Sequence, residues 1–216
     1  MTRSTHAVSV LVLSGAALAP RLALAADAPA QERPAERRSG VVVGMSIGAG
    51  LFGASGYPDS ALKTGDPAYY SSSGLMGGTS TELFVMGALA DVLNFGLWVA
   101  GSGADNGTFH SRGTAGGFRV EAFPLYSVAP RLRDLGLHAK FGLGGMTLDA
   151  KDKVSPGAGG TQSFLGAGAF YELRLFSVLG GHTAIAPTIE YQSIFSTSAE
   201  RHGGFAGARF AFYGGP

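Results

Sequence analysis

The chain has 216 residues, of which 35 are glycine and only 14% are charged. Average soluble domains have roughly 25% charged residues and about 7% glycine, so this composition is unusual for a soluble protein. The net charge of +1, with no basic stripe, argues against nucleic acid as a partner. The absence of cysteine excludes disulfides, thiolate catalysis and cysteine-based metal sites.

The N-terminus carries the three parts of a secretory signal peptide. Arg3 precedes an apolar block at residues 7–19, and Ala23-Leu24-Ala25 forms an A-x-A cleavage site. We expect a signal peptide at residues 1–25, with cleavage after Ala26 as the alternative. Residues 26–39 are rich in proline, alanine and charge, which predicts a flexible periplasmic leader with Arg38 in solvent. The remaining residues, 40–216, are expected to form one domain.

Eight segments of this domain alternate large apolar residues with small or polar residues. In the first, residues 40–51, Val41 and Val43 lie on one face and Gly44 and Ser46 lie on the other. The other segments lie at about 79–90, 94–102, 114–125, 135–146, 164–175, 185–195 and 205–213. A period of two is typical of strands with one face against apolar surroundings.

The less apolar face decides between a soluble barrel and a membrane barrel. A soluble barrel of the lipocalin kind would have an outer face rich in Lys, Glu and Thr, whereas this face is mostly Gly, Ala and Ser with a few charges. Such a face suits a narrow barrel interior, and the apolar face then contacts lipid. Backbone in lipid must pair internally, which requires a closed sheet. The sequence therefore predicts an all-β, up-and-down antiparallel transmembrane β-barrel of about eight strands.

The alternation assigns individual residues to the lipid face. We expect lipid contact for Thr79, Leu83, Val85, Phe141, Leu143, Leu173, Ile189 and Phe210. Pro187 also falls on this face, where its missing N–H predicts a bulge or a strand start. The segments predict long connections at about 52–78, 103–113 and 148–162, a shorter fourth at 196–203, and short turns between them. Long loops of such barrels face outside, which places both termini in the periplasm.

The last segment contains Gly207, Phe210 and Phe212 in a G-x-x-aromatic-x-aromatic pattern. With the alternation from residue 40 onward, it resembles the small eight-stranded outer-membrane barrels, the OmpA- and OmpX-type group that includes OmpW-like proteins. The resemblance implies an outer-membrane location, contact with membrane lipids and lipopolysaccharide, and recognition of this pattern by the barrel assembly machinery. The chain departs from the pattern by ending in Gly214-Gly215-Pro216 instead of an aromatic residue.

Charges in the segments fall on the glycine-rich, inward face. They comprise Glu82, Arg119, Glu121, Lys140, Glu172, Arg174, Glu190 and Arg209, together with His138. Four acids match four bases, which predicts an ion-pair network that closes the lumen alongside Trp98, Phe123 and Phe170. Strand heights place Lys140 beside Glu121 and Glu172, Glu190 near Arg209, and Glu82 with Arg119.

No catalytic, cofactor or metal site is expected, because the histidines lie on different segments without close ligand spacing. The leading hypothesis is a non-enzymatic structural or surface-contact protein with a possible extracellular ligand at its loops, the first of which holds Tyr57, Tyr69 and Tyr70. One alternative is a small-solute channel. Another is a lipid-modifying hydrolase or acyltransferase, for which His110-Ser111 in an external loop is the candidate pair.

Overall fold

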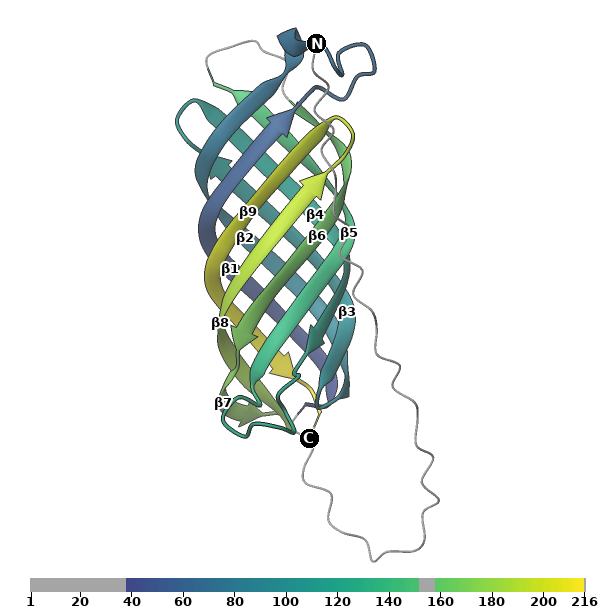
Figure 1. Ribbon diagram of the computed structural model, residues 1–216. Coiled ribbons are helices and arrows are strands. Elements are labelled where there is room, and N and C mark those ends of the chain that lie inside the picture. The colour runs from purple at the N-terminus through teal and green to yellow at the C-terminus, as the bar shows by residue number, and fades with distance from the viewer. Residues whose placement is uncertain (1–37, 152–157, 216) are drawn as a thin grey trace, which may run out of the picture. The chain divides into compact units, whose positions relative to one another are not determined.

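The computed structural model describes residues 38–151 and 158–215 (Figure 1). The expected signal peptide and leader lie outside the described residues, except for Arg38 and Ser39 at the leader's end. No helix in the described part of the chain is long and apolar enough to cross a membrane.

Nine antiparallel strands and one short 3-10 helix, η1 (Pro67–Tyr69), make up the fold. The strands are β1 (Gly40–Gly56), β2 (Ser71–Ala90), β3 (Leu93–Asp105), β4 (Phe109–Ala122), β5 (Leu135–Ala150), β6 (Ala158–Tyr171), β7 (Leu173–Val178), β8 (Gly181–Phe195) and β9 (Ala199–Tyr213). They form one sheet in the order β6-β5-β4-β3-β2-β1-β9-β8-β7, and pairing of β6 with β8 closes it. β6 and β7 pair in turn with β8, so they share one of eight positions in the wall. The predicted up-and-down, eight-position antiparallel barrel is confirmed.

The segment expected as one strand at 164–175 is split between β6 and β7. Pairing of β6 with β8 ends at Phe170 opposite Thr188, and pairing of β7 starts at Leu173 opposite Ile185. Between them, the backbone N–H of Glu172 donates to the carbonyl of Asp134 at 2.9 Å. Pro187 lies opposite this break and pairs with β9. The bulge or strand start predicted at Pro187 is not found, because β8 begins at Gly181 and its register with β9 is regular there. The irregularity lies instead in the facing β6 and β7, and a residue without an N–H is tolerated where that ladder is interrupted.

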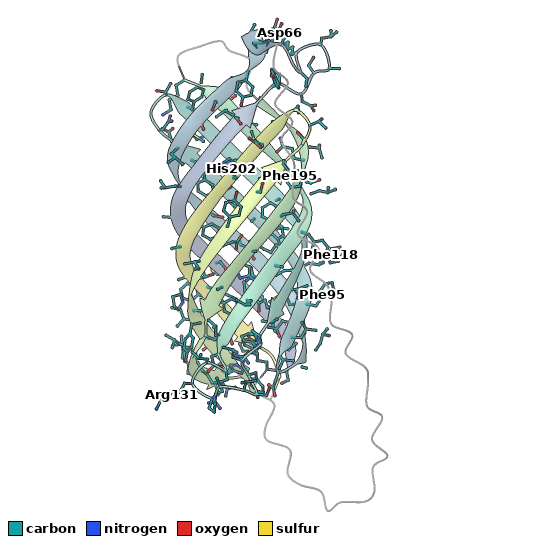
Figure 2. The ribbon with its side chains drawn as sticks, in the orientation of Figure 1. Asp66, Phe95, Phe118, Arg131, Phe195 and His202 are labelled. Carbon is teal, nitrogen blue, oxygen red and sulfur yellow. The ribbon has the colours of Figure 1, made fainter. Side chains whose placement is uncertain are left out.

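The two faces of the wall have the predicted composition. All eight residues assigned to lipid face outward, with exposed fractions of 56% for Leu83, 67% for Leu143 and 63% for Ile189. Phe95 and Phe118 also project from the wall (Figure 2), and their rings stack with centroids 5.8 Å apart. The exposed apolar residues form a belt around the barrel, as lipid contact requires.

The two ends of the barrel differ from the expected loop pattern. At the terminal end, where β1 begins and β9 ends, the connections are 91–92, 123–134 and 179–180. At the opposite, distal end they are 57–70, 106–108, the stretch after Lys151 and 196–198. The loops expected at 103–113 and 196–203 are therefore mostly strand, and only 106–108 and 196–198 remain as connections. The terminal-end connection 123–134, expected as a short turn, is longer than either of them.

Loops were predicted where strands continue because the outward residues in the distal half of the wall are polar. On β4 the outward series begins with His110, Arg112 and Thr114 before it reaches Phe118, so the apolar alternation starts only partway along the strand. Most strands are 13 to 20 residues long, whereas about 9–11 residues cross a bilayer. The wall therefore continues beyond the apolar belt as a rim with a polar outer face. This distal rim includes Asp105, His110, Arg112, Thr114, Thr147, Asp149, Glu200 and His202.

The lumen is packed along its length. Its distal part holds an apolar cluster that includes Phe52, Met76, Met146 and Leu148. Its central part holds a second cluster that includes Phe84, Trp98, Phe164 and Ile194. Buried charged side chains fill the part toward the terminal end.

Candidate functional site

The inward charges of neighbouring strands lie at matched heights. Arg119 on β4 is directly opposite Lys140 on β5, and Glu121 is opposite His138. Strand alternation directs all four side chains into the lumen. A Cβ added at Gly166 would lie 3.2 Å from Cε of Lys140 and 3.3 Å from Oε1 of Glu190, so glycine leaves the room that these side chains use.

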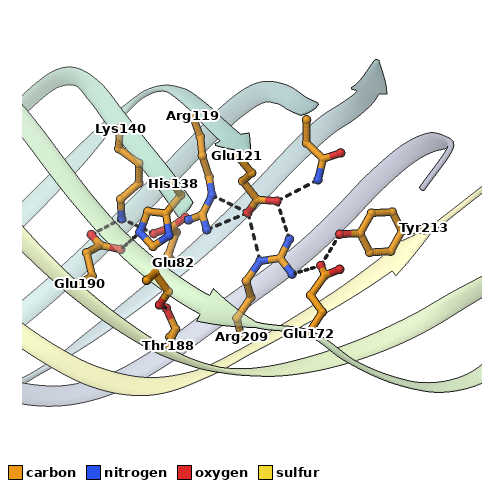
Figure 3. A network of polar contacts seen from close by, with 12 residues as sticks. Glu82, Arg119, Glu121, His138, Lys140, Glu172, Thr188, Glu190, Arg209 and Tyr213 are labelled. Carbon is orange, nitrogen blue, oxygen red and sulfur yellow. Dashed lines mark hydrogen bonds and ion pairs between the residues drawn. The ribbon is translucent and has the colours of Figure 1, made fainter. Parts of the chain in front are cut away.

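The first half of the network joins four strands (Figure 3). The ammonium group of Lys140 contacts carboxylate oxygens of both Glu82 and Glu190. Glu82 also accepts a hydrogen bond from Nη1 of Arg119, and Glu190 Oε2 lies 2.9 Å from Nε2 of His138. Acids thus separate the two neighbouring bases Arg119 and Lys140, which would otherwise repel each other.

The second half continues from Arg119 toward the terminal end. Arg119 Nε donates to Glu121 Oε1 at 3.0 Å, and Arg209 holds both oxygens of Glu121 through Nε and Nη2 at 3.1 and 2.8 Å. Arg209 Nη1 then donates to Glu172 Oε1 at 2.9 Å, and the hydroxyl of Tyr213 donates to the same oxygen. Such two-pronged arginine–carboxylate contacts are among the strongest hydrogen bonds in proteins.

Arg38 completes the network at the terminal end. It is 1% exposed, its Nε donates to Glu172 at 3.0 Å, and its Nη2 donates to Asp134 at 2.9 Å. Its guanidinium carbon lies 3.4 Å from the centroid of the Phe123 ring. The expectation of a solvated Arg38 is therefore wrong. Its polar sequence neighbours gave no signal of burial. The inward acids and bases also matched in the sequence, so no unpaired acid pointed to Arg38.

Other expected placements differ as well. Arg174 does not enter the network: β7 is exposed along its length, and Arg174 Nη2 lies 2.8 Å from Nδ1 of His182. Of the expected pairs, Glu82 with Arg119 is present. Lys140 pairs with Glu82 and Glu190, and Arg209 pairs with Glu121 and Glu172. Comparing the heights of residues on adjacent strands predicts neighbours along the wall. It does not predict contacts across the lumen, such as that between Glu82 on β2 and Lys140 on β5.

Aromatic rings pack against the charged groups. Lys140 Nζ lies 4.9 Å from the Trp98 ring centroid, and the guanidinium carbon of Arg209 lies 4.6 Å from that of Phe170. Cations over ring faces gain electrostatic stabilisation where water is excluded. The rings and ion pairs together fill this part of the lumen.

The candidate pair His110 and Ser111 lies on strand β4 and not in a loop. Ser111 points inward and donates to the carbonyl of Thr147 at 2.8 Å, whereas His110 lies at the outer rim and accepts from Nε of Arg112 at 2.9 Å. The two side chains point to opposite faces, so His110 cannot take a proton from Ser111. Among the described residues, no three His, Asp or Glu side chains are grouped to hold a metal ion.

A closed antiparallel sheet with an outward apolar belt and a charged, packed interior defines the fold class of small transmembrane β-barrels. No protein-family model matches the sequence, and no curated protein matches it. Among solved structures the fold is similar to Ail, the attachment invasion locus protein of Yersinia pestis, at 10% identity and a TM-score of 0.45, over 80% of this chain and 99% of that one. It is also similar to the N-terminal β-barrel domain of Pseudomonas aeruginosa OprF, at 14% identity and a TM-score of 0.42, over 81% and 98% of the two chains. A third similar structure is the outer membrane protein OprG from Pseudomonas aeruginosa, at 12% identity and a TM-score of 0.37, over 82% and 98%.

Proposed function

We propose that this protein is exported to the outer membrane and acts there as a sealed, non-enzymatic barrel that holds its distal rim at the cell surface. The observation that carries the proposal is the filled lumen. Glu121, Arg209 and Lys140 are each at most 2% exposed, and the alternating acids and bases are tied to one another across the barrel. A small cavity beside Arg38 and Glu172 holds about 10 Å³, which is roughly the space of one water molecule.

The polar distal rim supports a role in surface contact. Its outer face carries His110, Arg112 and Asp149 where lipid-facing residues would be expected in a barrel that only spans the bilayer. The longest described connection at this end, 57–70, packs Tyr57 against Tyr70 with ring centroids 5.2 Å apart. Tyrosines on a rigid support suit adaptable contacts with an extracellular ligand. Lipids and lipopolysaccharide would surround the belt below the rim.

Electrical recording tests the sealed lumen. The purified protein in planar bilayers should show no steady conductance, because ion pairs and rings occupy the path. Arg209→Ala should lower the stability of the barrel, and any conductance of this variant should appear only where the barrel is destabilised. Reproducible single-channel steps in the parent protein, with an ion selectivity that shifts in Arg209→Ala, would replace this proposal with a small-solute channel.

Proteolysis of intact cells tests the orientation. Trypsin should cut after Lys63 in the distal connection 57–70 without permeabilisation. Arg131 in the terminal connection 123–134 is the matched control, which should be cut only after the outer membrane is opened. The reverse pattern would place the rim in the periplasm.

Assembly is the remaining part of the proposal. Phe210 and Phe212 both point outward from β9, and Gly207 lies opposite Gly48 on β1. This arrangement supports recognition of the last strand by the barrel assembly machinery. Phe210→Ala with Phe212→Ala should slow appearance of the folded form in cells, while Phe118→Ala on β4 should not. Equal rates for both variants would contradict this role.

A further inference from the structure

Arg201 on β9 is a buried cation outside the ion-pair network. It is 1% exposed, and its side chain crosses the lumen so that Nη1 donates to Oγ of Ser102 on β3 at 2.7 Å. No carboxylate among the described residues lies within ion-pair distance of it. The acid next to it in sequence, Glu200, faces outward and accepts a hydrogen bond from Ser55.

The unused edge of this guanidinium suits an anion. Nε and Nη2 are both buried without a hydrogen-bond partner in the described part of the chain. These two nitrogens form the edge whose parallel N–H groups bind carboxylates and other anions in two-pronged fashion. Phe52 covers one face of the group, with its ring centroid 4.4 Å from the guanidinium carbon.

Two glutamines supply independent evidence from neighbouring strands. Ile194 on β8 lies opposite both Arg201 on β9 and Phe164 on β6. From this level, Gln192 on β8 is the next inward residue toward the terminal end, and Gln162 on β6 is the next toward the distal end. Each is 3% exposed, and Nε2 of Gln192 and both Nε2 and Oε1 of Gln162 have no partner among the described residues. Buried amides are normally satisfied, so unused polar atoms on both sides of the Arg201 level support a bound group at this height of the lumen.

We propose that the Arg201 fork binds a small monovalent anion, a halide or a small carboxylate, at the level of the distal rim. A lone buried cation is costly, and an anion would neutralise it while accepting from Nε and Nη2. The outward neighbours of Arg201 are Glu200 and His202, so the site lies at the level of the polar distal rim, beyond the apolar belt. A Cβ at Gly113 would lie 2.8 Å from Nη1, so glycine there leaves room for the end of the guanidinium that Ser102 binds.

Crystals of the parent protein grown in sodium bromide provide the first test and need no variant. An anomalous peak for bromine should lie next to Nε and Nη2 of Arg201. Water alone at this position, both in these crystals and in crystals grown in sodium formate, overturns the proposal.

Thermal unfolding in detergent provides the second test. At constant ionic strength, the midpoint should be higher in chloride, bromide or formate than in gluconate, which is too large to enter, and it should rise with the logarithm of the small-anion concentration. Arg201→Met should remove this dependence. Arg112→Met, which removes an exposed arginine from the outer wall, is the matched control and should retain it. An equal anion dependence in Arg201→Met and the parent overturns the proposal, whereas a response to formate alone identifies the ligand as a carboxylate.

Discussion

Replacement of Arg209 by methionine is the most direct test of the ion-pair network. Arg209 is fully buried and makes three hydrogen bonds to Glu121 and Glu172. At about 1.5–3 kcal/mol for each bond to a charged group, their loss would cost about 4.5–9 kcal/mol if nothing compensated. Glu121 keeps Arg119, and Glu172 keeps Arg38, so part of that cost is avoided. We therefore expect a loss of about 3–5 kcal/mol, typical of breaking a buried pair.

The single tryptophan offers a suitable signal for this measurement. Trp98 is 2% exposed, its indole N–H donates to the carbonyl of Phe118 at 2.9 Å, and Lys140 lies over its ring. Its fluorescence during urea unfolding in lipid vesicles should report loss of lumen packing. Arg112→Met is the control and should change stability by no more than about 0.5 kcal/mol. Adding Glu121→Gln to Arg209→Met should recover part of the loss, because it removes one carboxylate from a network that the variant leaves with more acids than bases. A stability equal to the parent's in Arg209→Met would refute the reasoning.

Three further predictions concern other parts of the barrel. Phe141→Arg, on the apolar belt, should destabilise by about 2–4 kcal/mol in vesicles, while Thr147→Arg on the same face of β5 but on the rim should cost little; equal costs would place the belt elsewhere. Arg38→Met should lower the urea midpoint, since Glu172 and Asp134 lose a partner, and an unchanged midpoint would mean that Arg38 contributes nothing to closure. The pKa of the rim carboxyl Asp105 is lowered to about 2, first by a hydrogen bond from Lys151 at 2.8 Å and then by one from the backbone N–H of Gly107. Because the folded pKa is the lower one, this contribution is present above about pH 4 and is lost as pH falls toward 2; an NMR titration should show the pKa rising in Lys151→Met, and an unchanged value would exclude the contact.

The barrel itself could be predicted from sequence because its two environments impose a strict alternation. Val41, Leu83 and Phe141 are apolar and suit contact with lipid, whereas Gly44 and Glu82 on the other face suit a narrow interior. Odd and even positions along each strand can therefore be assigned directly to the outer and inner faces. The strand ends could not be predicted in the same way. On β4 the outward series changes from Phe118 to Thr114 and Arg112, and polar outward residues on a projecting strand look the same in sequence as a loop.

The members of the network were largely predictable, but their partners were not. Parity places Glu121 and Lys140 inward, yet the ion pairs depend on which side chains reach across the lumen. Arg209 on β9 reaches Glu121 on β4, several strands away. By alternation along its segment Arg174 should point inward. The chain breaks at Glu172, however, so β7 does not continue the alternation of β6. Arg38 precedes the alternation altogether, so no periodic signal includes it.

The position of Arg209 on the last strand has a consequence for how the barrel folds. Before β9 docks between β8 and β1, Glu121 on β4 and Glu172 beyond β6 lack the arginine that joins them, and an open sheet would carry those acids without it. The charge balance of the lumen is therefore reached in the same step that removes the last free strand edges. A sheet without β9 lacks the contacts that Arg209 makes with Glu121 and Glu172. Docking of β9 therefore adds ion pairs and removes free strand edges together, which favours cooperative closure.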